Sequence, residues 1–286
     1  MREQSASSAP LPTGLGGSRG SSAPDASTLA PGLRLLPEDV RSDIYRLYHV
    51  LRTLDDLVDE DQPDAEQRVH AVECWARNEH ADTPESHTLT DLSKRYPLPA
   101  QAFLDFCQGM RHDIERAVIY TEDDLELYCQ QAGGTVGIML AHILGTTRPD
   151  AATQMATLGR AVQRTNIIRD IDDDLAHGRI YIARTTIERF GPPTPGARAE
   201  LIREQIARAD HLYEQAANAT SLLARGQRGM KLCAILYREI LRQIERDGYG
   251  QRAGRVVVPH WREYLLTAKQ RAKLRIHSAQ PRQDTA

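Results

Sequence analysis

Apolar side chains recur every three or four residues over most of this chain, which is the spacing of amphipathic helices. The first such pattern begins at Pro37, runs through Ile44, Leu47 and Leu51, and ends at residues 61–63. Comparable patterns predict helices over residues 64–77, 100–114, 122–139, 151–175, 198–225 and 229–247, and one from 260 onward. No stretch alternates apolar and polar residues between hairpin turns. The predicted class is therefore all-α, with roughly ten helices in a single domain around a central cavity.

The two ends of the chain differ in composition from the predicted domain. Residues 1–27 are rich in Ser, Gly, Ala and Pro and show little hydrophobic periodicity, which is typical of a disordered tail. The folded domain is predicted over residues 28–275, with a polar C-terminal tail over 276–286. Within the domain, residues 80–86 and 192–196 are predicted loops.

The helix that begins at Pro37 carries an acidic cluster near its end. Asp55 and Asp59 are four residues apart, and Asp56 and Asp59 three apart, so each pair shares one helix face. Arg52 precedes the cluster by one turn. One acidic cluster is weak evidence for a binding site.

A second acidic cluster lies in residues 165–181, which read TNIIRDIDDDLAHGRIY. Four aspartates fall within residues 170–174, and Asp170 and Asp174 would project from one helix face. Like charges at that spacing destabilise a helix unless something neutralises them, and carboxylate oxygens together with phosphate suit Mg²⁺. For one such cluster alone, a solvated acidic helix end is a better explanation than a metal site. Two clusters on facing helices favour a site that holds Mg²⁺ ions and a diphosphate.

Three glycines interrupt the predicted helix that follows Thr121. Gly133, Gly134 and Gly137 each cost about 1 kcal/mol relative to alanine in a helix interior. Such a cost indicates that something approaches the backbone closely. Another helix packed closely and a bound hydrocarbon chain are the two candidates, and they are compatible with each other.

Overall charge and cysteine content exclude several classes of function. The chain has 36 Lys and Arg against 39 Asp and Glu, so no basic field predicts nucleic-acid binding. The four cysteines form no CxxC pair, which favours buried thiols in a reducing compartment over disulfides or a zinc site. We expect a cytoplasmic protein. The basic segment from His260 predicts either a solvated terminal helix or a peripheral contact with an anionic membrane.

The two acidic segments resemble the paired aspartate-rich motifs of the squalene/phytoene synthase family, the head-to-head all-trans prenyl synthases. Three further stretches occur in that family's order, over residues 103–113, 128–137 and 237–255. The similarity spans roughly residues 35–265. It implies an isoprenoid-synthase-type helical bundle and a Mg²⁺-dependent 1′–1 condensation of two farnesyl or geranylgeranyl diphosphates. The product would be a thirty- or forty-carbon hydrocarbon such as squalene or phytoene, formed by way of a cyclopropylcarbinyl diphosphate.

The resemblance also assigns roles to individual residues. The metal ligands, for two or three Mg²⁺ ions, are expected to be Asp55, Asp56, Asp59, Asp170, Asp173 and Asp174. Diphosphate-binding and catalytic roles are expected for Arg52, Arg169, Arg179 and Tyr181. Substrate contacts are expected from Asn166, Asp113, Gln130, Gln131, Gly134, Val136 and Gly137. NADPH would be required only by a squalene-type member.

The chain departs from the family pattern at product-determining positions. Gln130 and Gln131 stand where members usually have an aromatic residue, and Ala183 stands where a proline commonly closes the second motif. An aromatic ring there would help to stabilise a carbocation. A divergent member that cyclises one prenyl diphosphate, or stops at a presqualene-type diphosphate or an alcohol, is therefore an alternative. A non-catalytic partner subunit is a third, against which the intact acidic motifs argue. The sequence gives no indication of oligomeric state.

Overall fold

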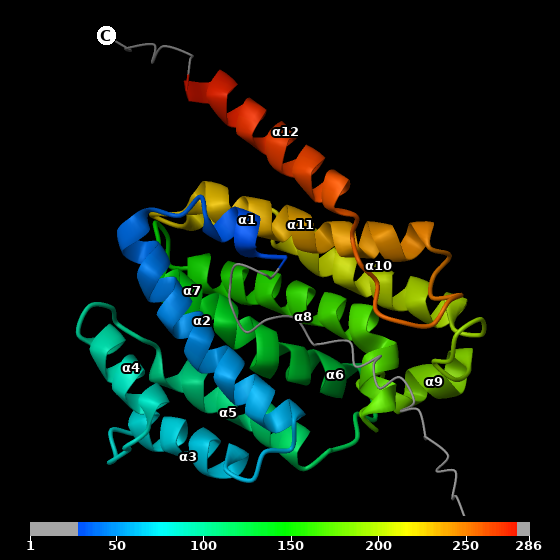
Figure 1. The fold of residues 1–286 in the computed structure, drawn as a ribbon, viewed down its shortest axis with the longest axis horizontal. Coiled ribbons are helices and arrows are strands. Elements are labelled where there is room, and N and C mark those ends of the chain that lie inside the picture. The colour runs from blue at the N-terminus through cyan, green and yellow to red at the C-terminus, as the bar shows by residue number, and fades with distance from the viewer. Residues whose placement is uncertain (1–27, 279–286) are drawn as a thin grey trace, which may run out of the picture.

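The computed structural model describes residues 28–278, with side chains as far as residue 270 (Figure 1). The tail predicted over residues 1–27, and residues 279–286 of the predicted C-terminal tail, lie outside the described part. Every regular element within it is helical. The elements are α1 (Ala30–Leu33), α2 (Glu38–Asp59), α3 (Ala65–Ala76), α4 (Pro84–Ser93), α5 (Ala100–Ile114), α6 (Glu122–Cys129), the π-helix η2 (Gln130–Gly134), α7 (Thr135–Leu144), α8 (Ala151–Ala176), α9 (Arg184–Phe190), α10 (Ala199–Gln215), the 3₁₀ helix η3 (Ala219–Leu222), α11 (Gln227–Arg246) and α12 (His260–Ser278).

The predicted all-α class is confirmed, and the long helices lie close to their predicted ranges. Helix α2 begins after Pro37 and ends at Asp59, beyond which Asp61 takes a left-handed φ of 51°. Helices α5, α8 and α11 match their predicted ranges to within two residues. The predicted end of the domain at residue 275 falls inside α12.

Two predictions of local structure are wrong. Helix α4 begins at Pro84, inside the predicted loop 80–86, because Thr83 and Ser86 cap each other's backbone N–H groups reciprocally. It has only ten residues and few apolar ones, so its periodicity is weak. The single helix predicted over 198–225 is instead α10 and η3. The chain must reverse direction before α11, and Gly226 completes that reversal with a φ of 70°.

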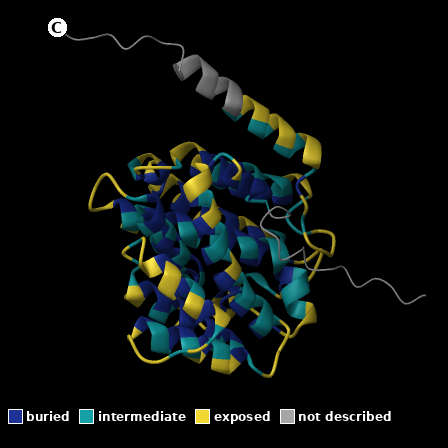
Figure 2. Cartoon of the chain, turned by 60° about the vertical axis from the view of Figure 1, so that its left-hand side comes forward, coloured by how far each residue is buried: buried dark blue, intermediate teal, exposed yellow. Residues whose placement is uncertain are grey.

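Helix α8 lies at the centre of the bundle. It contacts α6, η2, α7, α10 and α11, and its buried side chains include Leu158, Ala161 and Ile167. Figure 2 shows buried residues filling the interior and exposed ones on the outer surfaces and loops. The helix that carries the second acidic cluster is therefore held on several sides, which fixes where its C-terminal carboxylates lie.

The glycines of η2 and α7 allow a close approach to α8. A Cβ atom on Gly137 would lie 2.1 Å from the carbonyl oxygen of Met155, and one on Gly133 would lie 2.5 Å from that of Gly159. Gly133 and Gly137 also line the central cavity. The expectation that something approaches the backbone closely is confirmed, since α8 lies against these glycines, and their other side borders space that a ligand can enter.

All four cysteines are free, and Cys107, Cys129 and Cys233 are buried. Burial raises the pKa of each of these three thiols to about 12. The expectation of buried, unpaired thiols is confirmed for these three cysteines.

Helix α12 extends away from the bundle (Figure 1) and exposes Trp261, Tyr264 and Leu265. The membrane contact predicted for this segment stays a prediction. Among the described residues, no helix combines the length and the apolar character needed to cross a bilayer.

Candidate active site

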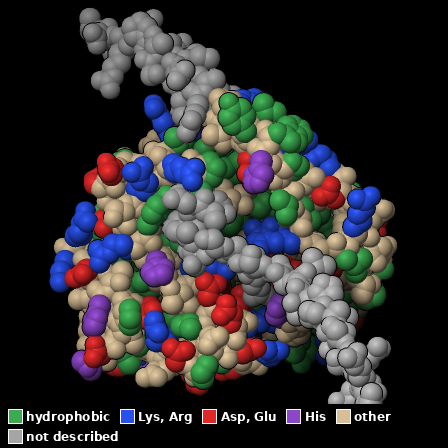
Figure 3. Space-filling model, in the orientation of Figure 1, with side chains coloured by type: hydrophobic (Ala, Val, Ile, Leu, Met, Phe, Trp, Pro, Cys, Tyr) green, Lys and Arg blue, Asp and Glu red, His purple; other side chains and the backbone are tan. Residues whose placement is uncertain are grey.

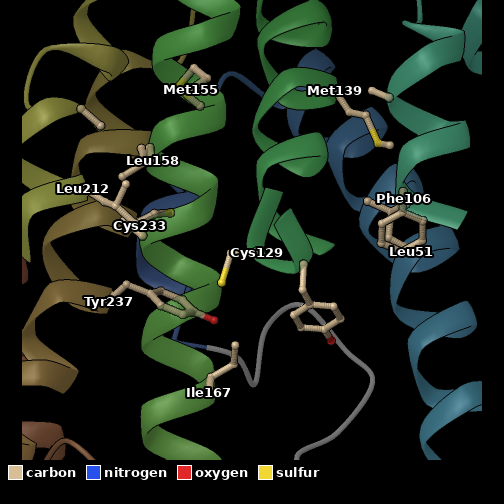
Figure 4. Close-up of a cluster of buried hydrophobic side chains, with 14 of the residues drawn as sticks. Leu51, Phe106, Cys129, Met139, Met155, Leu158, Ile167, Leu212, Cys233 and Tyr237 are labelled. Carbon is tan, nitrogen blue, oxygen red and sulfur yellow. The ribbon is translucent and has the colours of Figure 1, made fainter. Parts of the chain in front are cut away.

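An apolar cavity of about 250 Å³ lies between α1, α2, α5, α7, α8 and α11. Its lining runs along α2 from Ile44 to Asp55 and along α8 from Met155 to Asn166. Each stretch advances eleven residues, which at 1.5 Å per residue is about 17 Å of depth. Figure 4 shows Met155, Leu158 and Ile167 following one another along α8, with Tyr237 of α11 beside them. The cavity is therefore long and narrow.

One end of the apolar cavity opens into a polar mouth of about 150 Å³. The two spaces share Arg52, Asp55, Tyr128, Gln163 and Asn166. Acidic side chains gather over the C-terminal part of α2 on the face shown in Figure 3. The remaining residues of the mouth are Asp59, Asp113, Ile167, Arg169, Asp170, Asp173, Asp174, Tyr181 and Arg255. The two predicted acidic clusters thus meet at one site.

Two arginines pair with the three carboxylates at the end of α2. Arg52 Nη1 lies 2.6 Å from Asp55 Oδ2, Arg52 Nη2 lies 2.7 Å from Asp56 Oδ1, and Arg179 Nη1 lies 3.1 Å from Asp59 Oδ1. Burial and the charge of Asp59 together raise the pKa of Asp55 to about 7, against the opposing effect of Arg52. The Asp55 side chain is 40% exposed, but it faces the protein-lined mouth rather than open solvent. This part of the site is short of positive charge.

The carboxylate of Asp170 on α8 is held by two arginines. Arg169 Nε donates to Asp170 Oδ1 at 2.7 Å, and Arg255 Nε lies 3.0 Å from the same oxygen. One turn earlier, Asn166 donates from Nδ2 to Gln163 Oε1, while its own Oδ1 is buried without a hydrogen-bond partner. An amide oxygen that borders the mouth and accepts no hydrogen bond is a suitable ligand for a cation.

Asp113 lies beneath two phenols that stack on each other. Tyr128 and Tyr181 each donate to one of its oxygens at 2.9 Å, and their ring centroids are 5.0 Å apart. Burial and the charge of Asp113 raise the pKa of both phenols. Both hydroxyls therefore stay protonated at neutral pH and act as donors.

Most residues expected at the site line the mouth or the cavity, but five do not. Val136 and Gly137 line the apolar cavity. Asp56 pairs with Arg52, and Arg179 pairs with Asp59, so each contacts a residue that lines the mouth. Those outside both spaces are Asp56, Gln130, Gln131, Gly134 and Arg179.

Gln130, Gln131 and Gly134, which all lie in η2, form local contacts instead. Gln131 donates from its side chain to Gln108, and the side chain of Gln130 fills the space that a Cβ on Gly134 would occupy. Substrate contacts by these three residues stay a prediction.

Sequence reasoning missed several lining residues. Phe106, Tyr128, Tyr48 and Tyr237 bring aromatic rings to the cavity although positions 130 and 131 do not. Arg255 lies 85 residues after Asp170 in the chain, so its contact with that carboxylate follows only from the tertiary fold. The signal for Tyr48 was local, since it precedes Arg52 by one helical turn.

The residues at the mouth fit Mg²⁺. In the part of the chain that the structure describes, no three His, Cys, Asp or Glu side chains stand ready around a single point. Magnesium does not need such a cage, because it takes one or two carboxylates and completes its shell with phosphate and water. Hard oxygen donors from both α2 and α8, including the unpartnered Asn166 Oδ1, border one space. Whether the metal is bound stays a prediction.

Comparison with known proteins agrees with this geometry. Residues 24–262 match the family model for squalene/phytoene synthase. The chain is 32% identical over 265 residues to a 15-cis-phytoene synthase of Synechococcus elongatus, which covers 83% of this chain and 86% of the relative. It is 30% identical to a phytoene synthase of Thermus thermophilus, with 85% and 88% covered.

Solved structures give the same result. A dehydrosqualene synthase in complex with ligand has a TM-score of 0.77 at 26% identity, over 87% of this chain and 92% of that one. A squalene synthase from Alicyclobacillus acidocaldarius has a TM-score of 0.68 at 28% identity, over 77% and 89%. The sequence, the fold and the residues at the mouth all point to one family. This chain belongs to the squalene/phytoene synthase family and is a prenyltransferase.

Proposed function

We propose that this enzyme joins two prenyl diphosphates head to head, by a 1′–1 bond, with Mg²⁺ as its cofactor. The observation that carries the proposal is the continuity of the acidic mouth with the apolar cavity, through five shared residues. A molecule with a highly charged head and a long hydrocarbon tail matches that arrangement.

The mouth would hold the metal through carboxylates on both helices. Asp55 and Asp59 on α2, and Asn166, Asp170 and Asp174 on α8, are the proposed ligands. Mg²⁺ held there would supply Lewis-acid catalysis, because it would neutralise the charge that develops on the diphosphate leaving group. Asp56 and Asp173 were also predicted as ligands, and they are next to Asp55 and Asp174 in the sequence.

Arginines would bind the same diphosphate oxygens. Arg52, Arg169 and Arg255 border the mouth, and guanidinium groups suit bidentate contacts with phosphate. The C1–O bond of one substrate then breaks, and both electrons leave with the diphosphate. The double bond of the second substrate attacks the allylic cation, and loss of a proton closes the cyclopropane ring.

The cavity walls would protect and stabilise the cation. Leu47, Leu51, Phe106 and Val162 contribute apolar surface that excludes water, which would otherwise quench the cation. Tyr128 and the other lining aromatics present ring faces, and a cation is attracted to such faces. Departure of the second diphosphate and rearrangement of the ring then give the linear hydrocarbon.

We propose geranylgeranyl diphosphate as the substrate and phytoene as the product. Proteins named phytoene synthase are 30–32% identical to this chain with more than 80% of each covered. The purified protein should be incubated with Mg²⁺ and either farnesyl or geranylgeranyl diphosphate, with and without NADPH, and the products analysed by mass spectrometry.

Each outcome of that assay is informative. A forty-carbon hydrocarbon formed without NADPH supports the proposal, whereas a thirty-carbon one would reassign the substrate, and its dependence on NADPH would separate squalene from dehydrosqualene. A cyclic product from one prenyl unit, or an alcohol, would overturn head-to-head coupling. A cyclopropyl diphosphate as the final product would overturn the second step alone.

A further inference from the structure

The segment after α11, residues 247–259, is fastened to α8 and α10 by one buried arginine. Arg198 is 2% exposed, and its Nη1 and Nη2 lie 2.5 and 2.7 Å from the two carboxylate oxygens of Asp172. Its Nε donates to the carbonyl of Gly250 at 3.0 Å, and its Nη2 donates to that of Arg252 at 3.2 Å. The backbone N–H of Gly254 donates to Asp172 Oδ2 at 2.7 Å. We call residues 247–259 the strap.

The strap crosses α8 just where the second acidic cluster lies. Asp170 and Asp172 are two residues apart on one helix, so their side chains project from different sides of it. Gly254 and Arg255 are consecutive in the strap, and they contact Asp172 and Asp170 respectively. The contact with Asp172 therefore lies one residue away in the strap from the contact that Arg255 makes at the mouth.

We propose that Asp172 is a positioning residue: with Arg198 it anchors the strap, and it thereby presents Arg255 to the diphosphate that the mouth binds. This inference rests on the proposed function. Asp172 itself does not line the mouth. It acts through Arg255, whose side chain is 38% exposed and pairs with Asp170 at 3.0 Å.

The local geometry shows that the strap is built to fit this anchor. Gly250 has a φ of 75°, and a Cβ there would lie 2.4 Å from Arg198 Nε and 2.6 Å from Ile202 Cδ1. Gly254 has a φ of 106°, which L residues rarely adopt. Both glycines let the strap backbone turn its polar groups toward Arg198 and Asp172.

Binding of inorganic diphosphate in the presence of Mg²⁺, measured by calorimetry, tests the proposal without requiring turnover. Arg255→Ala should weaken binding about 10- to 100-fold, as expected for loss of a charged hydrogen bond. Asp172→Asn should weaken it by at least about 3-fold. In the Arg255→Ala background, Asp172→Asn should then have less than about a 2-fold effect, because the residue through which it acts is absent.

A matched control separates this role from general stabilisation. Asp210 on α10 is 18% exposed and pairs with Arg238 and Arg242 of α11, whereas Asp172 is 15% exposed and pairs with Arg198. Asp210→Asn should leave diphosphate affinity unchanged. Trypsin should cleave the strap after Arg252 or Arg255 faster in Asp172→Asn than in Asp210→Asn, with no metal present.

Arg198→Lys provides a second variant, since it keeps the charge but loses the forked contacts to Asp172 and the strap carbonyls. Additive effects of Asp172→Asn and Arg255→Ala, or unchanged affinity and unchanged proteolysis in both anchor variants, would overturn the positioning role. If the wild-type protein binds no diphosphate with Mg²⁺, the proposed function itself fails, and the proteolysis result still decides whether Asp172 anchors the strap.

Discussion

The packing of η2 against α8 leads to a quantitative prediction for Gly159→Ala. A Cβ on Gly159 would lie 2.2 Å from the carbonyl oxygen of Gly133 and 2.8 Å from its carbon, so the two backbones would have to separate by about 1 Å. Inserting a methyl group into a filled interior costs about 1–3 kcal/mol, and backbone contact places this case at the upper end. Replacing glycine in a helix returns about 1 kcal/mol. The net expectation is a loss of about 2 kcal/mol.

Gly109→Ala is the matched comparison, because Gly109 also lies inside a helix but its Cβ would be 3.3 Å from Gln131 Cβ. We expect its free energy of unfolding to stay within about 0.5 kcal/mol of wild type or to rise by up to about 1 kcal/mol. In thermal unfolding by calorimetry, the Tm of Gly159→Ala should be about 4 °C below that of the wild type. Equal Tm values for the two variants would show that the close approach of η2 and α8 is not a constraint on this fold.

Three further outcomes follow from other parts of the molecule. Tyr181→Phe removes one of the two phenols that donate to Asp113, and kcat/KM should fall about 10-fold with little change in Tm; an unchanged kcat/KM would exclude a role for that donor. Burial alone would raise the pKa of Glu122, but hydrogen bonds from Thr186 and Arg164 outweigh it and hold the pKa below its usual value. That stabilisation is complete above about pH 4.3 and is lost as the pH falls through the lower folded-state pKa, so the stability difference between wild type and Glu122→Gln, measured by urea unfolding, should shrink toward pH 3. Met230→Trp should fill the end of the cavity remote from the mouth and shift the farnesyl-to-geranylgeranyl preference toward the shorter chain by about 100-fold; an unchanged ratio would place the hydrocarbon tails elsewhere.

The sequence was sufficient for the class of fold and for the chemical character of the mouth. Helices α2 and α8 each carry an acidic cluster near the C-terminus, and this matching arrangement, together with the family resemblance, led to the prediction that the two clusters share one site. Helices α4 and α9 have only ten and seven residues, and α4 is marked by a capping box, so periodicity gives little indication of either helix. Contacts between residues far apart in the sequence, such as that of Arg255 with Asp170, also could not be predicted from local patterns.

The aromatic residues of the cavity lie at other positions than the family pattern predicts. The family usually has an aromatic residue at positions 130 and 131, next to Tyr128. In the structure Phe106, Tyr48 and Tyr237 line the cavity from three different helices. The π-helix at residues 130–134 changes the helical phase between Tyr128 and Val136, so a pattern of 3.6 residues per turn does not show which side chains enter the cavity.

The arginines at the mouth explain how the acidic clusters are compatible with a folded protein before any cation binds. Asp55, Asp59 and Asp170 each have a guanidinium within about 3 Å, so the mouth is not a bare cluster of like charges. The compensation is incomplete, since burial and the charge of Asp59 still raise the pKa of Asp55. A cation that arrives with a diphosphate brings both the charge that the carboxylates lack and the oxygens that the arginines prefer. The arginines that pair with these carboxylates are therefore the residues expected to exchange partners when Mg²⁺ and diphosphate bind.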